Sequence, residues 1–262
     1  MRMAQLNPCT VRNMADRRET GVQALAHGLE ILDLLLAQGR PLSGGEIAGS
    51  VGLHQSTVSR LLRTLIDNGY VARVRGGNVP ALRMLQFSRV ATAFPLVSAL
   101  RPLVAEIAQS RPADHVNVCA HVHGELIYLV RAQAGTEPVT GLSFPLHMSS
   151  AALRLLVDLP REEALSALRR SRDRYGWVGG PGLPADEESA LETARQSVDH
   201  DVLVLDRWTV NSLSAAIPLA VPGEHPLALA IAGPHTVDHR DLQLVLHDAR
   251  RRIESVIATV DA

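Results

Sequence analysis

Apolar residues recur at steps of three and four between residues 22 and 38, which is the spacing of one face of an α-helix. The stripe consists of Val22, Leu25, Leu29, Leu32 and Leu36. Gly39 follows it and readily adopts the left-handed backbone that ends many helices. The pattern therefore predicts a helix from about residue 22 to Gln38 whose apolar stripe lies in a hydrophobic core.

A pair of shorter helices is predicted next. Ser43 and Glu46 have the spacing of a capping box, so a helix is expected from there through Ser50, with a turn at Gly52. The segment from His54 to Asn68 then has an apolar face made of Val58, Leu61, Leu62 and Leu65. Its other face is polar and consists of Gln55, Ser56, Thr57, Ser59, Arg60, Arg63 and Thr64. Two short helices joined by a tight turn are typical of a helix-turn-helix.

A β-hairpin is predicted directly after these helices. Residues 70–74 have the composition of a strand, residues 75–78 contain two glycines suited to a turn, and a return strand is expected from Val79. Pro80 cannot donate a backbone hydrogen bond, so the return strand must be an edge there or end early. Such a hairpin beside a recognition helix is a wing.

The pattern changes after residue 80. A connecting helix is expected to about Ala93, followed by segments that alternate between helical and strand periodicity. Helices are predicted around 100–107 and at 150–157, 161–174, 186–199 and 238–260, and strands at 115–122, 126–130, 213–221 and 227–231. Strand pairs flanked by helices predict an α+β fold with a mostly antiparallel sheet. The expected division is a basic arm at 1–20, a winged helix-turn-helix at 21–80, a linker helix at 81–94 and a second domain at 95–262.

Composition narrows the possible functions. The chain has 262 residues, 46% of them hydrophobic, and a mean hydropathy of +0.07, as in folded proteins. No segment approaches the roughly 18 apolar residues of a membrane span, and the first residues lack the apolar core of a signal peptide, so a cytoplasmic location is expected. All 26 basic residues are arginine, which excludes lysine Schiff bases and Walker A phosphate loops.

The charge is unevenly distributed. Residues 1–90 carry eleven arginines and six acidic residues, whereas the rest carries 15 arginines and 21 acidic residues. A basic first third indicates contact with a polyanion, and short polar side chains with flanking arginines suit the major groove of DNA. The predicted DNA contacts are Ser43, Gln55, Ser56, Thr57, Ser59, Arg60, Arg63, Arg73, Arg75 and Asn78.

Several motifs in one order resemble a known family. The first run comprises Glu46-Ile47-Ala48, Gly52-Leu53, Ser56 to Leu62, Leu65 and Gly69-Tyr70-Val71. It resembles the winged helix-turn-helix of the isocitrate-lyase-regulator (IclR) family of bacterial transcription regulators. Pro145-Leu146-His147, Ser214 to Pro218 and Ala230 to Pro234 are similar to later motifs of that family. The resemblance extends from about residue 21 to about 255 and implies a GAF-like effector-binding domain and a homodimer or homotetramer.

The chain also departs from the family pattern. Leu153-Arg154 lies near the place of a usual Gly-Lys pair, Ser214 replaces a frequent Cys, and Val130 replaces the Asp that usually precedes the position of Arg131. Asp206 falls where the family has an acidic residue. These differences suggest that the pocket recognises an atypical ligand.

The second domain is expected to bind a small molecule rather than to catalyse a reaction. None of its serines lies in a Gly-x-Ser-x-Gly or Ser-x-x-Lys motif. His121 and His123 share a strand face and could hold a metal with His115 or Glu125, but no finger-like spacing completes such a site, so neither metal nor cofactor is expected. Amides near Ser149 and a guanidinium from Arg131 could instead bind a carboxylate. The predicted effector residues are Arg131, His147, Met148, Ser149, Ser150, Asp206, Ser212 and Ser214.

The sequence therefore predicts a transcription regulator whose affinity for double-stranded operator DNA is modulated by a small, anionic, carboxylate-type effector. Two alternatives remain open at this stage. One is a small-molecule hydrolase or isomerase with a vestigial basic domain. The other is a protein-interaction adaptor whose winged helix binds protein.

Overall fold

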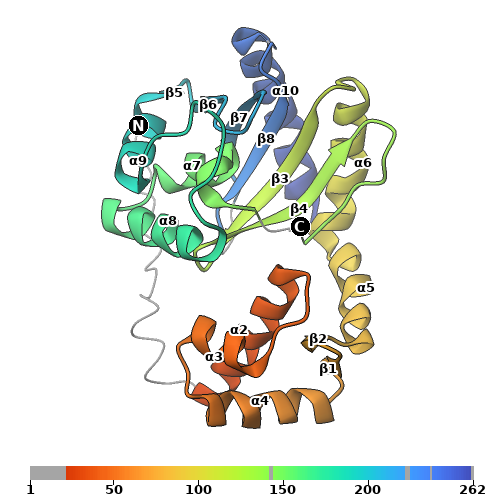
Figure 1. Cartoon of the computed structure of the whole chain (residues 1–262). Helices are drawn as coiled ribbons and strands as arrows, with labels where there is room; N and C mark the ends of the chain where they lie inside the picture. Colours follow the sequence, from red (N-terminus) through yellow and green to blue (C-terminus); the bar gives the residue numbers. More distant parts are fainter. Residues whose placement is uncertain (1–21, 142–143, 222–224, 237, 261–262) are drawn as a thin grey trace, which may run out of the picture. The chain divides into compact units, whose positions relative to one another are not determined.

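The computed structural model describes residues 22–141, 144–221, 225–236 and 238–260 (Figure 1). The chain forms two compact units, Met1–Arg89 and Val90–Ala262. Their boundary falls inside helix α5 (Leu85–Ala93), within the segment for which a linker helix is predicted. The predicted basic arm at residues 1–20 lies outside the described residues.

The first unit is a winged helix-turn-helix. Its elements are α2 (Gln23–Gln38), α3 (Gly44–Val51), α4 (Gln55–Asp67), β1 (Val71–Val74), β2 (Gly77–Pro80) and a 3-10 turn, η1 (Leu82–Met84). Its core is formed by Ile31, Leu35, Leu42, Ile47, Val58, Leu62 and Val71. The predicted apolar face of α4 is confirmed, because Leu61 and Leu65 pack against this core beside Val58 and Leu62.

The start of α3 forms as predicted. Ser43 is the N-cap residue, its side chain accepts a hydrogen bond from the Glu46 amide, and the Glu46 carboxylate accepts one from the Ser43 amide. Gly52 ends the helix in the left-handed region at a φ of 66°. The capping box is therefore confirmed, and it defines where the turn between α3 and α4 begins.

The predicted core stripe of α2 is wrong for four of its five residues, and only Leu32 packs against the core. Val22, Leu25, Leu29 and Leu36 are between 51% and 72% exposed, whereas Ile31 and Leu35 are buried. Helix α2 is apolar on more than one side, and residues 28, 31 and 35 define the side that meets the core. The second apolar stripe is left uncovered in this chain.

The wing closes more tightly than predicted. Its return strand begins at Gly77, which pairs with Val74 across a two-residue turn, Arg75 and Gly76. Gly77 has a φ of 146°, and a Cβ atom there would lie 2.3 Å from the carbonyl oxygen of Leu42. Only glycine therefore lets the wing approach the segment before α3.

The second unit is an α+β fold, which confirms the predicted class. Its strands are β3 (His115–Val122), β4 (Glu125–Gln133), β5 (Val198–Asp199), β6 (Val202–Asp206), β7 (Ser212–Leu219) and β8 (Leu227–Pro234). They form an antiparallel sheet in the order β4-β3-β8-β7-β6-β5. The helices are α6 (Pro95–Gln109), α7 (Ser150–Leu156), α8 (Arg161–Tyr175), α9 (Glu187–Gln196) and α10 (His239–Val260), with a 3-10 turn, η2 (Leu146–Met148).

Helices cover both faces of this sheet. Helices α6 and α10 lie on one face, and α7 lies on the other with α8 and α9 outside it (Figure 1). Each face has its own hydrophobic core, which contains for example Val118 and Ile231 on the α6–α10 side and Ala216 and Ala230 on the α7 side. The sheet residues therefore divide into two sets by simple alternation.

Two strands are absent from the sequence prediction. The helix expected at 186–199 ends at Gln196, and β5 and β6 follow it. His200 and Asp201 turn the chain between these strands with positive φ angles. The apolar run from Val202 to Leu205 is a buried strand, and its composition was the available signal.

Across the described ranges, no helix is long and apolar enough to cross a membrane.

Candidate nucleic-acid interface and ligand site

Helix α4 presents a bare polar face. Gln55, Ser56, Ser59, Arg60 and Arg63 are exposed, and Thr57 is half-buried. Buried Val58 and Leu62 fix the orientation of the helix, so the opposite face points to solvent. In the described part of the chain, neither Arg60 nor Arg63 forms a salt bridge. These two guanidinium groups are available for an external anion.

The start of α4 is held by His54, a residue absent from the predicted contacts. The ring nitrogen Nδ1 of His54 accepts a hydrogen bond from the Ser56 amide at 3.3 Å and lies 2.8 Å from the Ser56 hydroxyl. His54 is the N-cap residue of the helix. The signal that could have found it is the need of every helix for a cap ahead of its first polar turn.

The remaining predicted DNA contacts divide into free and occupied side chains. Arg73 and Arg75 are exposed on the wing. Asn78 is only 4% exposed, and its side-chain amide donates to the carbonyl of Leu42 at 3.0 Å. Asn78 therefore holds the wing together from inside the unit and does not reach its surface. The hydroxyl of Ser43 is likewise engaged in capping α3.

Glu46 provides a fixed negative charge beside this surface. The hydrogen bonds from the Ser43 amide and hydroxyl, together with the Arg40 guanidinium at 2.9 Å, lower the pKa of Glu46 to about 2. Arg40 is neutralised by this pair. The net positive charge of the surface therefore comes from α4 and the wing.

In the second unit, strand register brings several polar side chains onto the sheet face that carries α7. Arg131 of β4 pairs with Asn117 of β3, which pairs in turn with Ala230 of β8 and then with Ala216 of β7. The adjacent row runs Gln133, His115, Ala232 and Ser214. A β-bulge between Val118 and Cys119 shifts the register of β4, so Tyr128 and Arg131 share this face although they are three residues apart. Small alanines thus lie between the polar groups.

Three polar atoms on this face lack partners within the described residues. They are the side-chain oxygen of Asn117, which is 5% exposed, Nδ1 of His115 and, further along β3, Nε2 of His121. The guanidinium of Arg131 lies 5.8 Å from the centre of the Tyr128 ring. Burial and the charge of Arg131 lower the pKa of His115. A cation and an unpaired amide oxygen on a face of small residues can hold a small polar or anionic molecule.

The predicted residues of the 145–150 segment border the same face through α7. Ser149 is buried, its hydroxyl accepts a hydrogen bond from the Ala152 amide at 3.3 Å, and it also hydrogen-bonds to the Tyr128 side chain. Ser150 is buried in the first turn of α7, and Met148 is half-buried. Burial raises the pKa of Tyr128 well above its usual range. Because the Ser149 hydroxyl accepts its hydrogen bond, the Ala152 amide is already satisfied within the chain.

His147 is tied to a neighbouring loop. It is fully buried, its ring stacks on Trp177 with 4.3 Å between ring centres, and Nε2 donates to the carbonyl of Val178 at 3.1 Å. Desolvation lowers the pKa of this imidazole. The neutral ring then carries its lone pair on Nδ1, which has no partner within the described residues.

Two predicted effector residues do not join the group. Asp206 pairs with Leu213, whose side chain belongs to the α6–α10 face, so Asp206 alternates away from Ser214 and Arg131. It is exposed and forms a salt bridge with Arg207 at 3.4 Å. Ser212 shares the face of Ser214, but its hydroxyl donates to the carbonyl of Thr209 at 3.1 Å.

Comparisons with known proteins agree with this fold. The family model for the IclR helix-turn-helix domain matches residues 24–75. An HTH-type transcriptional regulator of Mycobacterium tuberculosis is 33% identical over 160 residues, which are 58% of this chain and 61% of that relative. An HTH-type transcriptional regulator of Comamonas testosteroni is 26% identical over 92% of this chain and 88% of its own length. The crystal structure of an IclR family transcriptional regulator from Brucella abortus superposes with a TM-score of 0.75 at 25% identity, covering 92% of this chain and 94% of that one.

The first unit matches the IclR helix-turn-helix family, and the whole chain is similar in fold to regulators of that family. Its winged helix-turn-helix is the IclR DNA-binding fold, and the relatives named above are transcriptional regulators. A second solved structure, an IclR homologue from Microbacterium hydrocarbonoxydans complexed with 4-hydroxybenzoate, has the same fold with a TM-score of 0.63 at 21% identity, covering 90% of this chain and 99% of that one.

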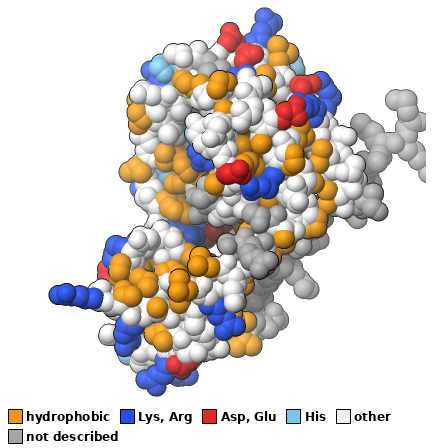
Figure 2. All heavy atoms as spheres, turned by 90° about the vertical axis from the view of Figure 1, so that its right-hand side faces the viewer, with side chains coloured by type: hydrophobic (Ala, Val, Ile, Leu, Met, Phe, Trp, Pro, Cys, Tyr) orange, Lys and Arg blue, Asp and Glu red, His pale blue; other side chains and the backbone are white. Residues whose placement is uncertain are grey.

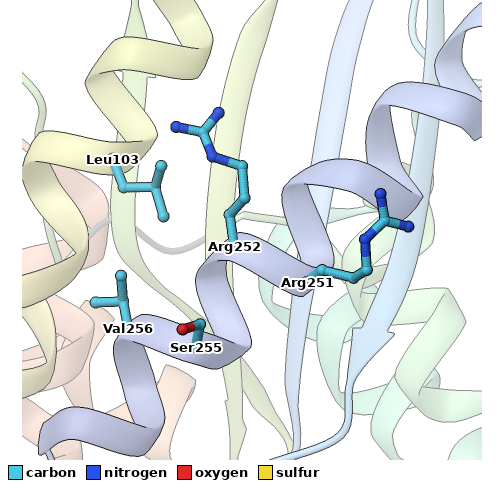
Figure 3. A pocket seen from close by; sticks show the side chains of 5 residues that line it. All are labelled: Leu103, Arg251, Arg252, Ser255 and Val256. Carbon is cyan, nitrogen blue, oxygen red and sulfur yellow. The ribbon is translucent and has the colours of Figure 1, made fainter.

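The chain also has a shallow groove elsewhere on its second unit. It lies along α6 and α10 and is lined by Leu103, Arg251, Arg252, Ser255 and Val256 (Figure 3). Arg252 is paired with Glu106 at 2.7 Å and Arg251 with Asp248 at 2.9 Å. Its charges are therefore already balanced, and none of the predicted effector residues lines it.

Asn117 and His115 lie on the same face as Arg131 and Ser214 but are absent from the predicted effector residues. The alternation His115, Val116, Asn117, Val118 already placed both polar residues on one strand face. What the sequence did not contain was the cross-strand register that sets Asn117 beside Arg131. In the described ranges, no three His, Cys, Asp or Glu side chains are grouped so that they could hold a metal ion.

Proposed function

We propose that this IclR-family protein regulates transcription by binding double-stranded operator DNA through residues 21–80, and that a small anionic effector bound in residues 95–262 modulates this affinity. The observation that carries the proposal is the polar face of α4, on which two unpaired arginines flank short hydrogen-bonding side chains. Most solvated helix faces mix charges of both signs, but Asp67 at the far end is the only acidic residue of α4.

Each side chain of this surface has a distinct role in the proposal. Gln55, Ser56 and Ser59 face base edges in the major groove, because α4 meets the groove with its N-terminal half. Arg60 and Arg63 contact phosphates, and Arg73 and Arg75 on the wing reach the neighbouring backbone or minor groove. Thr57, being half-buried, contributes mainly to the fit of the helix.

Fluorescence anisotropy tests the DNA-binding part. The full chain is titrated onto the DNA that precedes its own reading frame and onto scrambled DNA of equal length, each at two or more salt concentrations. We expect tighter binding to the former, and Arg60→Ala and Arg63→Ala should each weaken it and lower the salt slope by about 1. Arg251→Ala is the matched control, because this exposed arginine lies on α10. Unchanged binding of both α4 variants contradicts the assignment, and absence of binding to any DNA favours a protein-binding adaptor.

The effector part of the proposal rests on the sheet face beneath α7. Arg131 supplies the positive charge, Asn117 an unpaired amide oxygen that can accept a hydrogen bond from a ligand donor, and Ser214 a half-buried hydroxyl. The positions between these polar groups, 216, 230 and 232, are small alanines. A small carboxylate suits these groups, since guanidinium and carboxylate form strong charge-assisted hydrogen bonds. The 4-hydroxybenzoate complex of the Microbacterium homologue shows that a protein of this fold has bound a small carboxylate.

Ligand-induced stabilisation tests this site. The full chain is heated with a panel of aromatic and aliphatic carboxylates, 4-hydroxybenzoate among them, and unfolding is followed by tryptophan fluorescence. At least one carboxylate should raise the midpoint, and Arg131→Gln should abolish that shift. Arg101→Gln is the control, because Arg101 belongs to α6 on the other side of the sheet. An equal shift in wild type and Arg131→Gln contradicts the role of Arg131.

We also propose that the regulator is a homodimer. Two-fold proteins match palindromic operators, and apolar faces of α2 and α5 are uncovered in the single chain. The exposed side chains are Val22, Leu25, Leu29 and Leu36 on α2 and Leu85, Phe87 and Val90 on α5, with Leu82 just before it and Phe94 just after it. Figure 2 shows exposed hydrophobic side chains on the lower part of the view with arginines around them. Leu25→Ser with Leu29→Ser should shift sedimentation toward monomer, whereas Leu244→Ser on α10 should not.

An effector acts on DNA affinity through this assembly. It can change the affinity only as far as it binds the DNA-bound and free arrangements differently, which typically amounts to about 1 to 3 kcal/mol. The anisotropy titration repeated with a stabilising carboxylate measures this coupling directly.

A further inference from the structure

The N-cap of α4 is a histidine that contacts one of the proposed base-reading residues. His54 has an extended backbone conformation with a φ of −65° and a ψ of 140°, and the helix begins at Gln55. The Nδ1 atom of His54 lies 3.3 Å from the Ser56 amide nitrogen and 2.8 Å from the Ser56 hydroxyl oxygen. Both groups of Ser56 thus meet the same ring nitrogen.

Which of these groups can donate a proton fixes the direction of the two hydrogen bonds between Ser56 and His54. A backbone N–H can only donate, so Nδ1 must carry a lone pair and the neutral ring must hold its proton on Nε2. The hydroxyl of Ser56 then cannot accept from Nδ1, and at 2.8 Å it must donate its own proton to this atom. The Ser56 hydroxyl therefore donates its only proton to the imidazole of His54.

This contact changes what Ser56 can offer to DNA. A free serine hydroxyl rotates and serves as donor or acceptor, so it ordinarily reads either kind of base edge. With its proton on His54, the exposed Ser56 oxygen presents only lone pairs to solvent. In the major groove, donors come from the amino groups of adenine N6 and cytosine N4, whereas guanine O6 and N7 and thymine O4 are acceptors.

We infer that His54 is a specificity-determining positioning residue, which makes Ser56 an obligate hydrogen-bond acceptor and restricts the base it contacts to adenine or cytosine. The inference rests on the proposed DNA-binding function of α4. His54 acts through Ser56, so its loss changes which bases are accepted at one position instead of weakening binding to all sequences alike.

Selection from a randomised double-stranded DNA library tests this role without a known operator. The full-length wild type and the variants His54→Ala, Ser56→Ala and the double variant are each used to select DNA, and the bound pools are sequenced. Wild type should show one position at which adenine or cytosine is favoured about fivefold. Both single variants should lose that preference at the same position, and the double variant should lose no more than either.

Two further variants separate positioning from folding. Arg63→Ala should weaken binding to all sequences while leaving the base preferences unchanged, as expected of a phosphate contact. Asn is among the best N-cap residues, so His54→Asn keeps α4 capped while its shorter side chain places no ring nitrogen against the Ser56 hydroxyl. It should relax the same position and keep the circular dichroism of wild type.

The outcomes distinguish a failure of the inference about His54 from a failure of the proposed DNA-binding function. If wild type enriches no sequence, the proposed DNA recognition fails and the role of His54 fails with it. If wild type enriches a motif and His54→Ala and His54→Asn enrich the same motif with the same preference at the Ser56-dependent position, only the inference is overturned. A motif that does not change in Ser56→Ala overturns it equally.

Discussion

The first unit exposes the side chains that we assign to DNA, whereas Asn117, Arg131 and Ser214, which we assign to the effector, are buried or half-buried in the second. Arg60 and Arg63 lie on the solvent face of α4 and need no partner in the chain because water satisfies them. Asn117 is almost completely buried, and its oxygen has no partner among the described residues. A buried polar atom without a partner costs free energy, typically about 1 to 3 kcal/mol.

This difference shows how each kind of site can be recognised. On the exposed helix, function is visible as composition, because nothing inside the protein requires two arginines and a run of hydroxyls on one face. In the sheet, the proposed ligand site is marked by a buried polar atom without a partner among otherwise well-packed residues. The two tryptophans, Trp177 and Trp208, both belong to the second unit, so their fluorescence reports on that unit alone.

The largest difference in stability between the two units is expected from Gly77→Ala. A Cβ atom at this position would lie 2.3 Å from the Leu42 carbonyl oxygen, and the φ of 146° is unfavourable for alanine. We expect a loss of about 3 kcal/mol or more in the stability of the first unit, together with loss of DNA binding. Far-UV circular dichroism should show an early loss of helix that tryptophan fluorescence does not follow.

Gly49→Ala is the control for this substitution. Gly49 lies within α3, and a Cβ atom there meets nothing within 4 Å. Alanine in a helix interior is favoured over glycine by up to about 1 kcal/mol, so this variant should be as stable as wild type or more so. Equal behaviour of the two variants would mean that the wing does not depend on close approach to Leu42.

An intermediate effect, confined to the second unit, is expected from Arg154→Ala. Arg154 is 5% exposed, and its guanidinium donates to the Asp201 carbonyl and to the Asp158 carboxylate, both at 2.7 Å. Removing it leaves a small cavity and an unpaired carbonyl, for which we expect about 2 kcal/mol of destabilisation. The tryptophan fluorescence midpoint should fall by roughly 5 °C while DNA affinity at 25 °C stays unchanged. A large change in DNA affinity would show that α7 is coupled to the DNA-binding unit.

The sequence predicted the first unit better than the second, for a physical reason. Residues of a helix-turn-helix contact neighbours near in sequence, so the Ser43–Glu46 capping box and the apolar face of α4 could be found from spacing alone. Helix α2 is the exception, because it is apolar on two sides and periodicity does not tell which side the core occupies.

In the sheet, function depends on pairings across long sequence separations. Arg131 and Asn117 become neighbours only through the β3–β4 register, and Asp206 leaves the group because alternation along β6 and pairing with Leu213 turn it to the other face. Neither fact can be obtained from the order of motifs along the chain. The family resemblance supplied the fold and the region in which we propose the ligand site, but not which of its residues face one another.

The smallest effect concerns the charge of Glu46 and depends on pH. Hydrogen bonds from Ser43 and the Arg40 guanidinium lower the pKa of Glu46 from 4.5 to about 2 in the folded chain. A carboxylate whose pKa is lower in the folded state stabilises that state above the unfolded pKa, and this contribution is lost as pH falls through the folded pKa. The stability difference between wild type and Glu46→Gln should therefore be constant above pH 4.5, shrink between pH 4.5 and about 2, and vanish below that.

Far-UV circular dichroism during urea unfolding at several pH values measures this difference, and tryptophan fluorescence should show none of it. Ser43→Ala provides the matched background: without the hydroxyl, the pKa of Glu46 should return toward its ordinary value, so the pH-dependent part of the difference should become smaller. If the difference persists unchanged at pH 2, the ionised carboxylate contributes nothing to the α3 cap. The cap would then depend on hydrogen-bond geometry alone.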